Sequence, residues 1–133
     1  MKEELDFIER YIGLQRIRIT NKEDIVIETK ISWDEKNANI APMLLLPFIE
    51  NAFKYGISYE EPSSIRVTIT VTGEKLDCQI TNTDHSGKNR QPSGGIGIAN
   101  TVKRLDLQYP GKYHLEQKNE NGIYAVSLKL DLN

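Results

Sequence analysis

Apolar residues near the start of the chain recur with the spacing of an α-helix. Positions 5, 8 and 12 form one apolar row, and positions 7, 11 and 14 form a second row. Residues three or four apart lie on the same face of a helix, so each row is helical in its spacing. The pattern predicts an amphipathic helix over residues 2–18.

Apolar and polar residues alternate, as they do in β-strands, in several later segments. These are residues 24–32, 65–71, 76–82, 113–118 and 123–130. The sequence "TGEK" lies between the second and third segments, and "NENG" lies between the last two. Alternating runs joined by short polar turns are typical of hairpins. The chain is therefore expected to contain one β-hairpin in its middle and another at its end.

Two apolar segments predict further helices. The first is "IAPMLLLPFIENAFKYG", in which Pro42 is expected to open the helix because its first turn does not need that N–H. Pro47 lies one turn further on and should either mark the true first turn or kink the helix. Gly56 is expected just past its end. The second segment, residues 96–109, has apolar residues at 98, 102, 105 and 109.

The order of these elements predicts an α+β protein. We expect a two-layer α/β sandwich, in which helices cover one face of a mixed, mostly antiparallel sheet. The 133 residues fit a single domain over positions 1–133. The single cysteine, Cys78, cannot form an internal disulfide and is expected to be a small apolar residue in a strand.

Charge and hydropathy exclude several classes of partner. The chain has 17 Lys and Arg residues against 19 Asp and Glu residues, which gives no overall bias toward nucleic acid or anionic membranes. Its longest apolar run, residues 40–49, contains two prolines and is shorter than the roughly 20 residues that cross a bilayer. We therefore expect no nucleic-acid partner and no direct membrane contact by this chain.

Polar residues interrupt the first apolar helix in a way that calls for a partner. Glu50, Asn51 and Lys54 lie among large apolar residues in "PFIENAFKYG". A buried amide without a hydrogen-bond partner costs about 1–3 kcal/mol. Asn51 should therefore be satisfied either by another part of the chain or by a ligand.

A glycine pair precedes the last helix, in "GGIGIAN" at residues 94–100. Gly95 and Gly97 would let backbone N–H groups approach a ligand, and a helix N-terminus favours an anion such as phosphate. Such a turn is often merely structural, and no Lys-Ser or Lys-Thr follows it as in a Walker loop. The loop before it, residues 83–95, has no periodicity, and loops of this length are usually functional or disordered.

Taken together, these segments resemble the ATP-binding domain of sensor histidine kinases, in particular its LytS-like branch. "PFIENAFKYG" is similar to the N box of that family, and "GGIGIANTVKRL" is similar to its G2 box. "EELDFIERYIGLQRIR" is similar to the helix that connects the dimerisation segment to the ATPase domain, here residues 1–18. The resemblance covers nearly the whole chain and implies a Bergerat-type ATPase fold that binds ATP and Mg²⁺.

The resemblance also implies roles for residues of the N box. Asn51 would be the Mg²⁺ ligand, which would satisfy the buried amide. Lys54 and Tyr55 would reach the phosphates or the base. Glu50 would activate the attacking histidine or help to hold the metal, unless it is simply a surface carboxylate.

Further roles fall in the loop and the last helix. Gly95 and Gly97 would frame the triphosphate, and Ile96 and Asn100 would belong to the same nucleotide-binding segment. Arg104 would either contact phosphate or anchor its helix. Residues 83–95 would form a lid over the nucleotide, in which Lys88 and Arg90 are either phosphate contacts or solvated charges.

Two residues depart from the family pattern. Pro47 stands four residues before Asn51, where hydrolytic relatives have a Glu that activates water, so this chain should hydrolyse ATP slowly. Asn82 stands where the family usually has the Asp that reads adenine. An amide can flip, so we expect weaker preference for ATP over GTP unless a neighbour such as Thr81 or Thr83 fixes it.

The expected function is therefore that of an ATP-binding catalytic domain, which passes the γ-phosphoryl group to a histidine on an upstream segment. Neither His85 nor His114 is expected to be that histidine. The implied partners are the dimerisation and phosphoacceptor segment and a response regulator, for which the LytTR type is one candidate. The implied location is the cytoplasmic side of an inner-membrane sensor. An anti-sigma-type serine/threonine kinase and a nucleotide-sensing scaffold without transfer activity remain alternatives.

Overall fold

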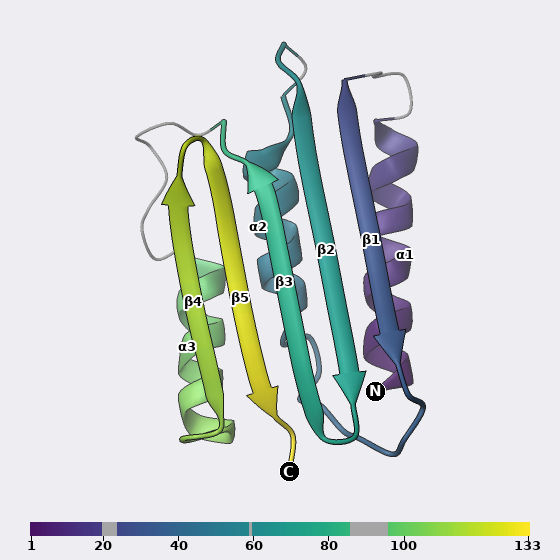
Figure 1. Cartoon of the computed structure of the whole chain (residues 1–133), viewed down its shortest axis with the longest axis vertical. Helices are drawn as coiled ribbons and strands as arrows, with labels where there is room; N and C mark the ends of the chain where they lie inside the picture. The colour runs from purple at the N-terminus through teal and green to yellow at the C-terminus, as the bar shows by residue number, and fades with distance from the viewer. Residues whose placement is uncertain (20–23, 59, 86–95) are drawn as a thin grey trace.

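The computed structural model describes residues 1–19, 24–58, 60–85 and 96–133. Its described part is a five-stranded sheet with three helices on one face (Figure 1). The helices are α1 (Lys2–Arg18), α2 (Leu46–Gly56) and α3 (Ile96–Gln108). The strands are β1 (Ile25–Trp33), β2 (Ser63–Thr72), β3 (Lys75–Thr83), β4 (Tyr113–Glu120) and β5 (Ile123–Asp131). The α+β sandwich predicted from the sequence is confirmed.

The sheet has the strand order β1-β2-β3-β5-β4. β1 pairs with β2 in parallel, and α2 lies on the connection between them. All other neighbours are antiparallel, and both predicted hairpins are present, as β2-β3 and β4-β5. The sheet is therefore mixed and mostly antiparallel, as expected.

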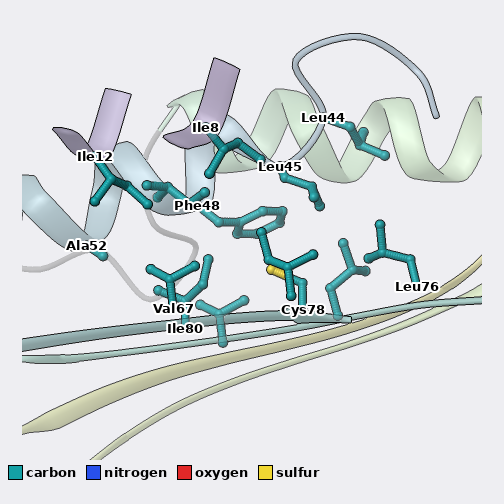
Figure 2. Packing of buried hydrophobic residues seen from close by; sticks show 14 of the residues in the cluster. Ile8, Ile12, Leu44, Leu45, Phe48, Ala52, Val67, Leu76, Cys78 and Ile80 are labelled. Carbon is teal, nitrogen blue, oxygen red and sulfur yellow. The ribbon is translucent and has the colours of Figure 1, made fainter. Parts of the chain in front are cut away.

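The core fills the space between the sheet and the helices (Figure 2). In β3 every second side chain is buried, from Leu76 through Cys78 and Ile80 to Asn82, because alternate residues of a strand point to the same face. Phe48 of α2 packs into this layer. Cys78 is buried in a strand as predicted, and burial raises the pKa of its thiol to about 12.

The first helix buries only one of its two predicted rows. The row at positions 5, 8 and 12 faces the core, whereas Phe7 and Leu14 of the second row are exposed. Tyr11, between them, packs edge-to-face on Phe53 with ring centroids 5.9 Å apart. Within the described part of the chain, no helix has the length and apolar composition needed to span a bilayer.

The prediction that Pro42 opens the second helix is wrong. α2 begins at Leu46, and Pro47 lies in its first turn, which was the alternative considered for this residue. Met43 adopts a left-handed backbone conformation with φ 58°, which a right-handed helix cannot contain. Partners distant in sequence hold this conformation, because Glu4 Oε2 accepts a hydrogen bond from the Met43 N–H at 3.0 Å.

Gly56 differs from its prediction in both place and purpose. It is the last residue of α2 rather than the residue beyond the helix, and Ile57 is the C-cap. A Cβ atom at this position would lie 2.8 Å from Cβ of Asn82 and 3.2 Å from Cγ1 of Ile65. Glycine is therefore needed because the end of α2 presses directly on β2 and β3.

Candidate functional site

The polar residues of α2 divide between two faces of the helix. Asn51 is buried, with 8% of its surface exposed, and Tyr55, one turn further on, is half-buried. Glu50 and Lys54 form the neighbouring row and are exposed. Residues four apart in a helix lie on the same face, so Asn51 and Tyr55 form one row and Glu50 and Lys54 another.

Of the two exposed residues, Glu50 lies toward α1. Burial raises the pKa of Tyr11 in α1, and the negative charge of Glu50 raises it further. Lys54 Nζ lies 5.2 Å from the ring centroid of Tyr55, within the range of a cation–π contact. Lys54 therefore reaches across to the row of Asn51, whereas Glu50 lies on the α1 side of the helix.

Asn82 lies at the end of β3, against the last residue of α2. It is 2% exposed, and its Nδ2 donates to the carbonyl oxygen of Thr83 at 2.7 Å. This hydrogen bond fixes the orientation of the amide, so that Oδ1 points away from the carbonyl of Thr83. Oδ1 is buried and has no hydrogen-bond partner among the described residues. A buried acceptor in this condition costs about 1–3 kcal/mol unless something donates to it.

A hydrogen-bonded cluster holds the start of the segment that follows β3. The Oγ1 of Thr83 donates to the carbonyl of Gly56 at 3.0 Å, and the backbone N–H of His85 donates to the carbonyl of Tyr55 at 3.1 Å. The ring of His85 contacts Ser63 Oγ at 3.0 Å and Glu61 Oε2 at 3.2 Å. These contacts fix the beginning of the predicted lid to the end of α2.

Among the described residues, the N-terminal turn of α3 is open where the sequence predicted a phosphate site. A Cβ atom on Gly97 would meet no described atom within 4 Å, and Asn100 is exposed. The first turn of α3 has no acidic residue that would compensate its N–H groups. Thr101, buried one turn later, donates through Oγ1 to the carbonyl of Gly97 at 3.0 Å.

Part of the predicted site lies outside the described residues. This applies to Gly95, to Lys88 and Arg90, and to the lid from residue 86 to residue 95. Ile96 begins α3, but only its backbone is described. The predictions for these residues stay predictions.

Arg104 holds a loop of the protein itself. Its Nη2 donates to the carbonyl of Pro42 at 2.7 Å, and Nη1 donates to that of Met43 at 3.4 Å. Tyr109, just past the end of α3, accepts from the backbone N–H of Ala41 through its hydroxyl at 2.9 Å. These contacts anchor α3 to the loop before α2, and a contact of Arg104 with phosphate stays a prediction.

No cluster of protein ligands for a metal is present in the described ranges. Within them, no three His, Cys, Asp or Glu side chains come together as a metal site. Mg²⁺ in phosphate-binding sites usually takes only one or two protein ligands and completes its shell with phosphate oxygens and water. A single amide oxygen from Asn51 is compatible with that pattern.

Several contacts of this site could not be predicted from local sequence. Gly56 meets Asn82, and Ser63 meets His85, across separations of more than twenty residues. The only signal in the sequence was the resemblance of "PFIENAFKYG", which ends at Gly56. It indicated that the end of α2 was special but not which strand it touched.

The architecture is that of histidine-kinase catalytic domains. The catalytic domain of histidine kinase ThkA superposes with a TM-score of 0.62 at 12% identity, covering 97% of this chain and 95% of that one. The mycobacterial sensor histidine kinase MprB gives a TM-score of 0.59 at 16% identity, covering 96% and 93%. The histidine kinase domain of the Erythrobacter litoralis blue-light-activated kinase EL346 gives 0.63 at 12% identity, covering 96% and 60%.

A relative that can be recognised from sequence is the sensor protein kinase HptS of Staphylococcus aureus. It is 36% identical over 121 residues, which are 89% of this chain and 22% of HptS. The chain thus spans about a fifth of the length of this relative. No family model matches the chain. The resemblance to the ATP-binding domain of sensor histidine kinases is confirmed by these comparisons, whereas nothing in them distinguishes the LytS-like branch.

Proposed function

We propose that this chain is the ATP-binding catalytic domain of a two-component sensor histidine kinase. It binds ATP and delivers the γ-phosphoryl group to a histidine on an upstream dimerisation and phosphoacceptor segment of the parent protein. The observation that carries the proposal is Asn82 Oδ1, a buried acceptor with no partner among the described residues, beside the end of α2. The exocyclic amino group of adenine is a donor that would satisfy this atom.

The residues of α2 supply the phosphate end of the proposed site. Asn51 offers one amide oxygen to Mg²⁺, which would bridge the phosphates and neutralise charge that develops during transfer. Lys54 Nζ lies over the ring of Tyr55, and its ammonium group would contact phosphate oxygens. Glu50, exposed on the α1 side, is available to the incoming histidine rather than to the metal.

The start of α3 supplies the anion-binding groups. Its N–H groups and the positive end of the helix dipole favour a phosphate there. Gly97 leaves open space for that approach, and Gly95, Ile96 and Asn100 belong to the same segment. Arg104 stabilises α3 through the carbonyls of the loop before α2 and is not assigned to the nucleotide.

The wider assignments follow from the kinship with sensor kinases. A response regulator would receive the phosphoryl group, and a LytTR-type regulator is one candidate. The chain would act on the cytoplasmic side of an inner-membrane sensor. Pro47 in the first turn of α2 supplies no base for water, so slow hydrolysis fits transfer to a protein histidine better than ATPase turnover.

Calorimetric titration of Mg-ATP into the wild-type chain and into Asn51→Ala tests the proposal. The variant should lose at least about tenfold in affinity with Mg²⁺ present, because a metal ligand is removed, and little in the presence of EDTA. Asn37→Ala, which removes an exposed amide from a loop, is the matched control and should bind like wild type. Equal affinities of all three proteins, with and without the metal, would contradict the assignment of Asn51.

A further inference from the structure

Among the described residues, one edge of the sheet is unprotected. β1 is the outermost strand, and among the described residues β2 is the only strand that pairs with it (Figure 1). Its sequence, IVIETKISW, is rich in β-branched residues, and only Glu28 and Lys30 carry charge. A long edge strand of this composition is a template for a further strand unless charges or a covering segment prevent pairing.

The opposite edge of the sheet has the usual protection. β4 is shorter than β1 and carries Glu116, Lys118 and Glu120. Charged side chains on an edge strand discourage pairing with another chain. The two edges of the same sheet therefore differ, and β1 is the longer and less charged of the two edge strands.

A groove runs beneath the unprotected edge, between the first half of α1 and the last half of β1. Its volume is about 490 Å³. Leu5 of α1 and Ile31 and Trp33 of β1 provide its apolar surface. A strand added to β1 would direct every second side chain toward the helix layer, which is where this groove lies.

The rim of the groove is acidic. Asp6 and Glu9 line it from α1, Glu35 lines it just past β1, and Lys2 is the only basic residue among the described side chains that line it. A groove with this balance attracts cationic groups and repels anionic lipid surfaces and nucleic acid. Its occupant should therefore combine positive charge with an apolar anchor.

We propose that the β1 edge and the acidic groove bind an extended segment of a partner protein, in which Lys or Arg side chains flank an aromatic residue. The segment adds a strand to the sheet, its aromatic side chain packs against Trp33, and its cations face Asp6 and Glu9. Main-chain pairing supplies affinity and the groove supplies specificity, as in other complexes formed by β-strand addition. The inference does not depend on ATP binding.

A second copy of this chain is a poorer occupant. Pairing of two β1 strands would bring two acidic rims to one interface, and juxtaposed like charges oppose association. The β1 strand itself supplies only Lys30 as a cation. Self-association is therefore an outcome that would overturn the proposal.

Trp33 makes the proposal directly measurable, because it is the only tryptophan in the chain. The probe is a capped synthetic heptapeptide, Thr-Arg-Thr-Phe-Thr-Arg-Thr, whose alternate side chains present two cations and one ring to the groove. Titration should shift and saturate the tryptophan fluorescence. Raising the ionic strength from about 0.05 M to about 0.5 M should weaken the affinity several-fold, because surface charge attraction is screened.

Three controls separate this site from non-specific attraction. The double variant Asp6→Asn/Glu9→Gln should lose roughly tenfold in peptide affinity, whereas Glu3→Gln, on α1 but outside the groove, should bind like wild type. The same peptide with alternate backbone amides N-methylated, prepared in both registers, should bind weakly in at least one register. A version with Glu for Arg should not bind.

The proposal is overturned by any of four results. The first is unchanged fluorescence at a peptide concentration of about 1 mM, which corresponds to negligible affinity. The second is equal binding of the peptide with Glu for Arg, and the third is full binding of both N-methylated peptides. The fourth is a stable dimer in sedimentation experiments without peptide, if Asp6→Asn/Glu9→Gln strengthens that dimer.

Discussion

At the scale of single residues, the site depends on the contact between Gly56 and Asn82. The glycine lets α2 end against β3, and the amide beside it is oriented by the carbonyl of Thr83. A methyl group added at Gly56 would displace the side chain of Asn82, which we assign to the nucleotide base. Stability and binding should therefore respond together to changes at this point.

Gly56→Ala should destabilise the fold and weaken nucleotide binding. The added Cβ would lie 2.8 Å from Cβ of Asn82, and overpacking of this kind costs about 1–3 kcal/mol. Gly13→Ala is the matched control, because a Cβ there meets nothing within 4 Å and the change should stabilise α1 by about 0.5–1 kcal/mol. Urea unfolding and ATP titration of both variants provide the measurements. A Gly56→Ala protein as stable as wild type would show that the contact is not tight.

Asn82 should give a clear preference for ATP over GTP. Its donor group is occupied by Thr83, so the amide offers only its oxygen, which accepts from adenine but faces an oxygen of guanine. The sequence left open whether a neighbour fixes this amide. Because Thr83 does so, weak preference for ATP over GTP is no longer expected. Competition binding should give ATP an advantage of at least roughly tenfold, corresponding to one unpaired buried group.

Asn82→Asp and Asn82→Ala should differ in their effects on stability and on nucleotide preference. The Asp variant would set a carboxylate oxygen against the carbonyl of Thr83, so it should lose stability, about 1–3 kcal/mol, without gaining selectivity. The Ala variant should lose most of the preference for ATP. If the wild type binds both nucleotides equally and the Asp variant excludes GTP, the amide is free to flip and this assignment fails.

At the scale of elements, a clasp joins α1, the loop before α2, and α3. Glu4 accepts from the N–H of Met43, and Arg104 donates to the carbonyls of Pro42 and Met43. The strained conformation of Met43 persists because both helices hold its backbone. Displacement of α1 would therefore be transmitted to α3, whose first turn is part of the proposed site.

Glu4 gives this clasp a defined dependence on pH. Burial raises the pKa of its carboxyl, although the Met43 N–H and the charge of Arg104 partly oppose that shift. Because the pKa of Glu4 is raised in the folded state, protonated Glu4 stabilises the fold. This stabilisation is fully present below the pKa that Glu4 has in the unfolded chain, and it is lost as pH rises through its pKa in the folded protein. The stability advantage of wild type over Glu4→Gln should therefore shrink as pH rises from about 4 to about 7.

Urea unfolding across that pH range measures the effect. Glu3→Gln changes an exposed carboxyl one residue away and should not reproduce the trend. Parallel stability curves for wild type and Glu4→Gln would mean that the carboxyl ionises in the folded protein as it does in the unfolded chain.

The elements were predictable because their patterns are local. The helix at the start, the alternation of β2, β3 and β5 and the final helix all follow from periodicity within one segment. The choice between Pro42 and Pro47 at the start of α2 was not predictable, because the left-handed Met43 depends on Glu4 and Arg104, which are far from it in sequence. The role of Arg104 was left open for the same reason.

The residues of the candidate site also include some that the local sequence predicts and some that depend on tertiary packing. Asn51 was predicted to be buried, because a polar residue in an apolar helix is visible in the sequence. The unpartnered oxygen of Asn82 was not visible, because it depends on where the end of α2 meets β3. The resemblance to a known family indicated which residues belong to the site, whereas tertiary packing determines the orientation and hydrogen bonds of each side chain.

At the scale of the whole molecule, the chain contains the proposed nucleotide site but no suitable acceptor histidine in its described part. Both ring nitrogens of His85 are engaged, with Ser63 and with Glu61. His114 lies on the uncovered face of the sheet, paired with Glu116 at 2.8 Å. The proposed site lies on the other face, among the helices (Figure 1).

The isolated chain should therefore not phosphorylate itself. Incubation with radiolabelled Mg-ATP should leave no acid-labile, base-stable phosphate at His85 or His114. A fusion that carries an upstream dimerisation segment from a sensor kinase should become labelled, and Asn51→Ala in that fusion should abolish the label. Phosphohistidine on the isolated chain would contradict the proposed division of labour.

The glycine at the end of α2 also has a genetic consequence. Every other amino acid has a Cβ atom, so no amino-acid substitution at position 56 avoids the clash with Asn82. A library selected only for protein abundance should already be depleted of variants at Gly56. The same library should tolerate variants at Asn51 until selection is applied to signalling. Comparison of the two selections would separate positions constrained by the fold from those constrained by the chemistry.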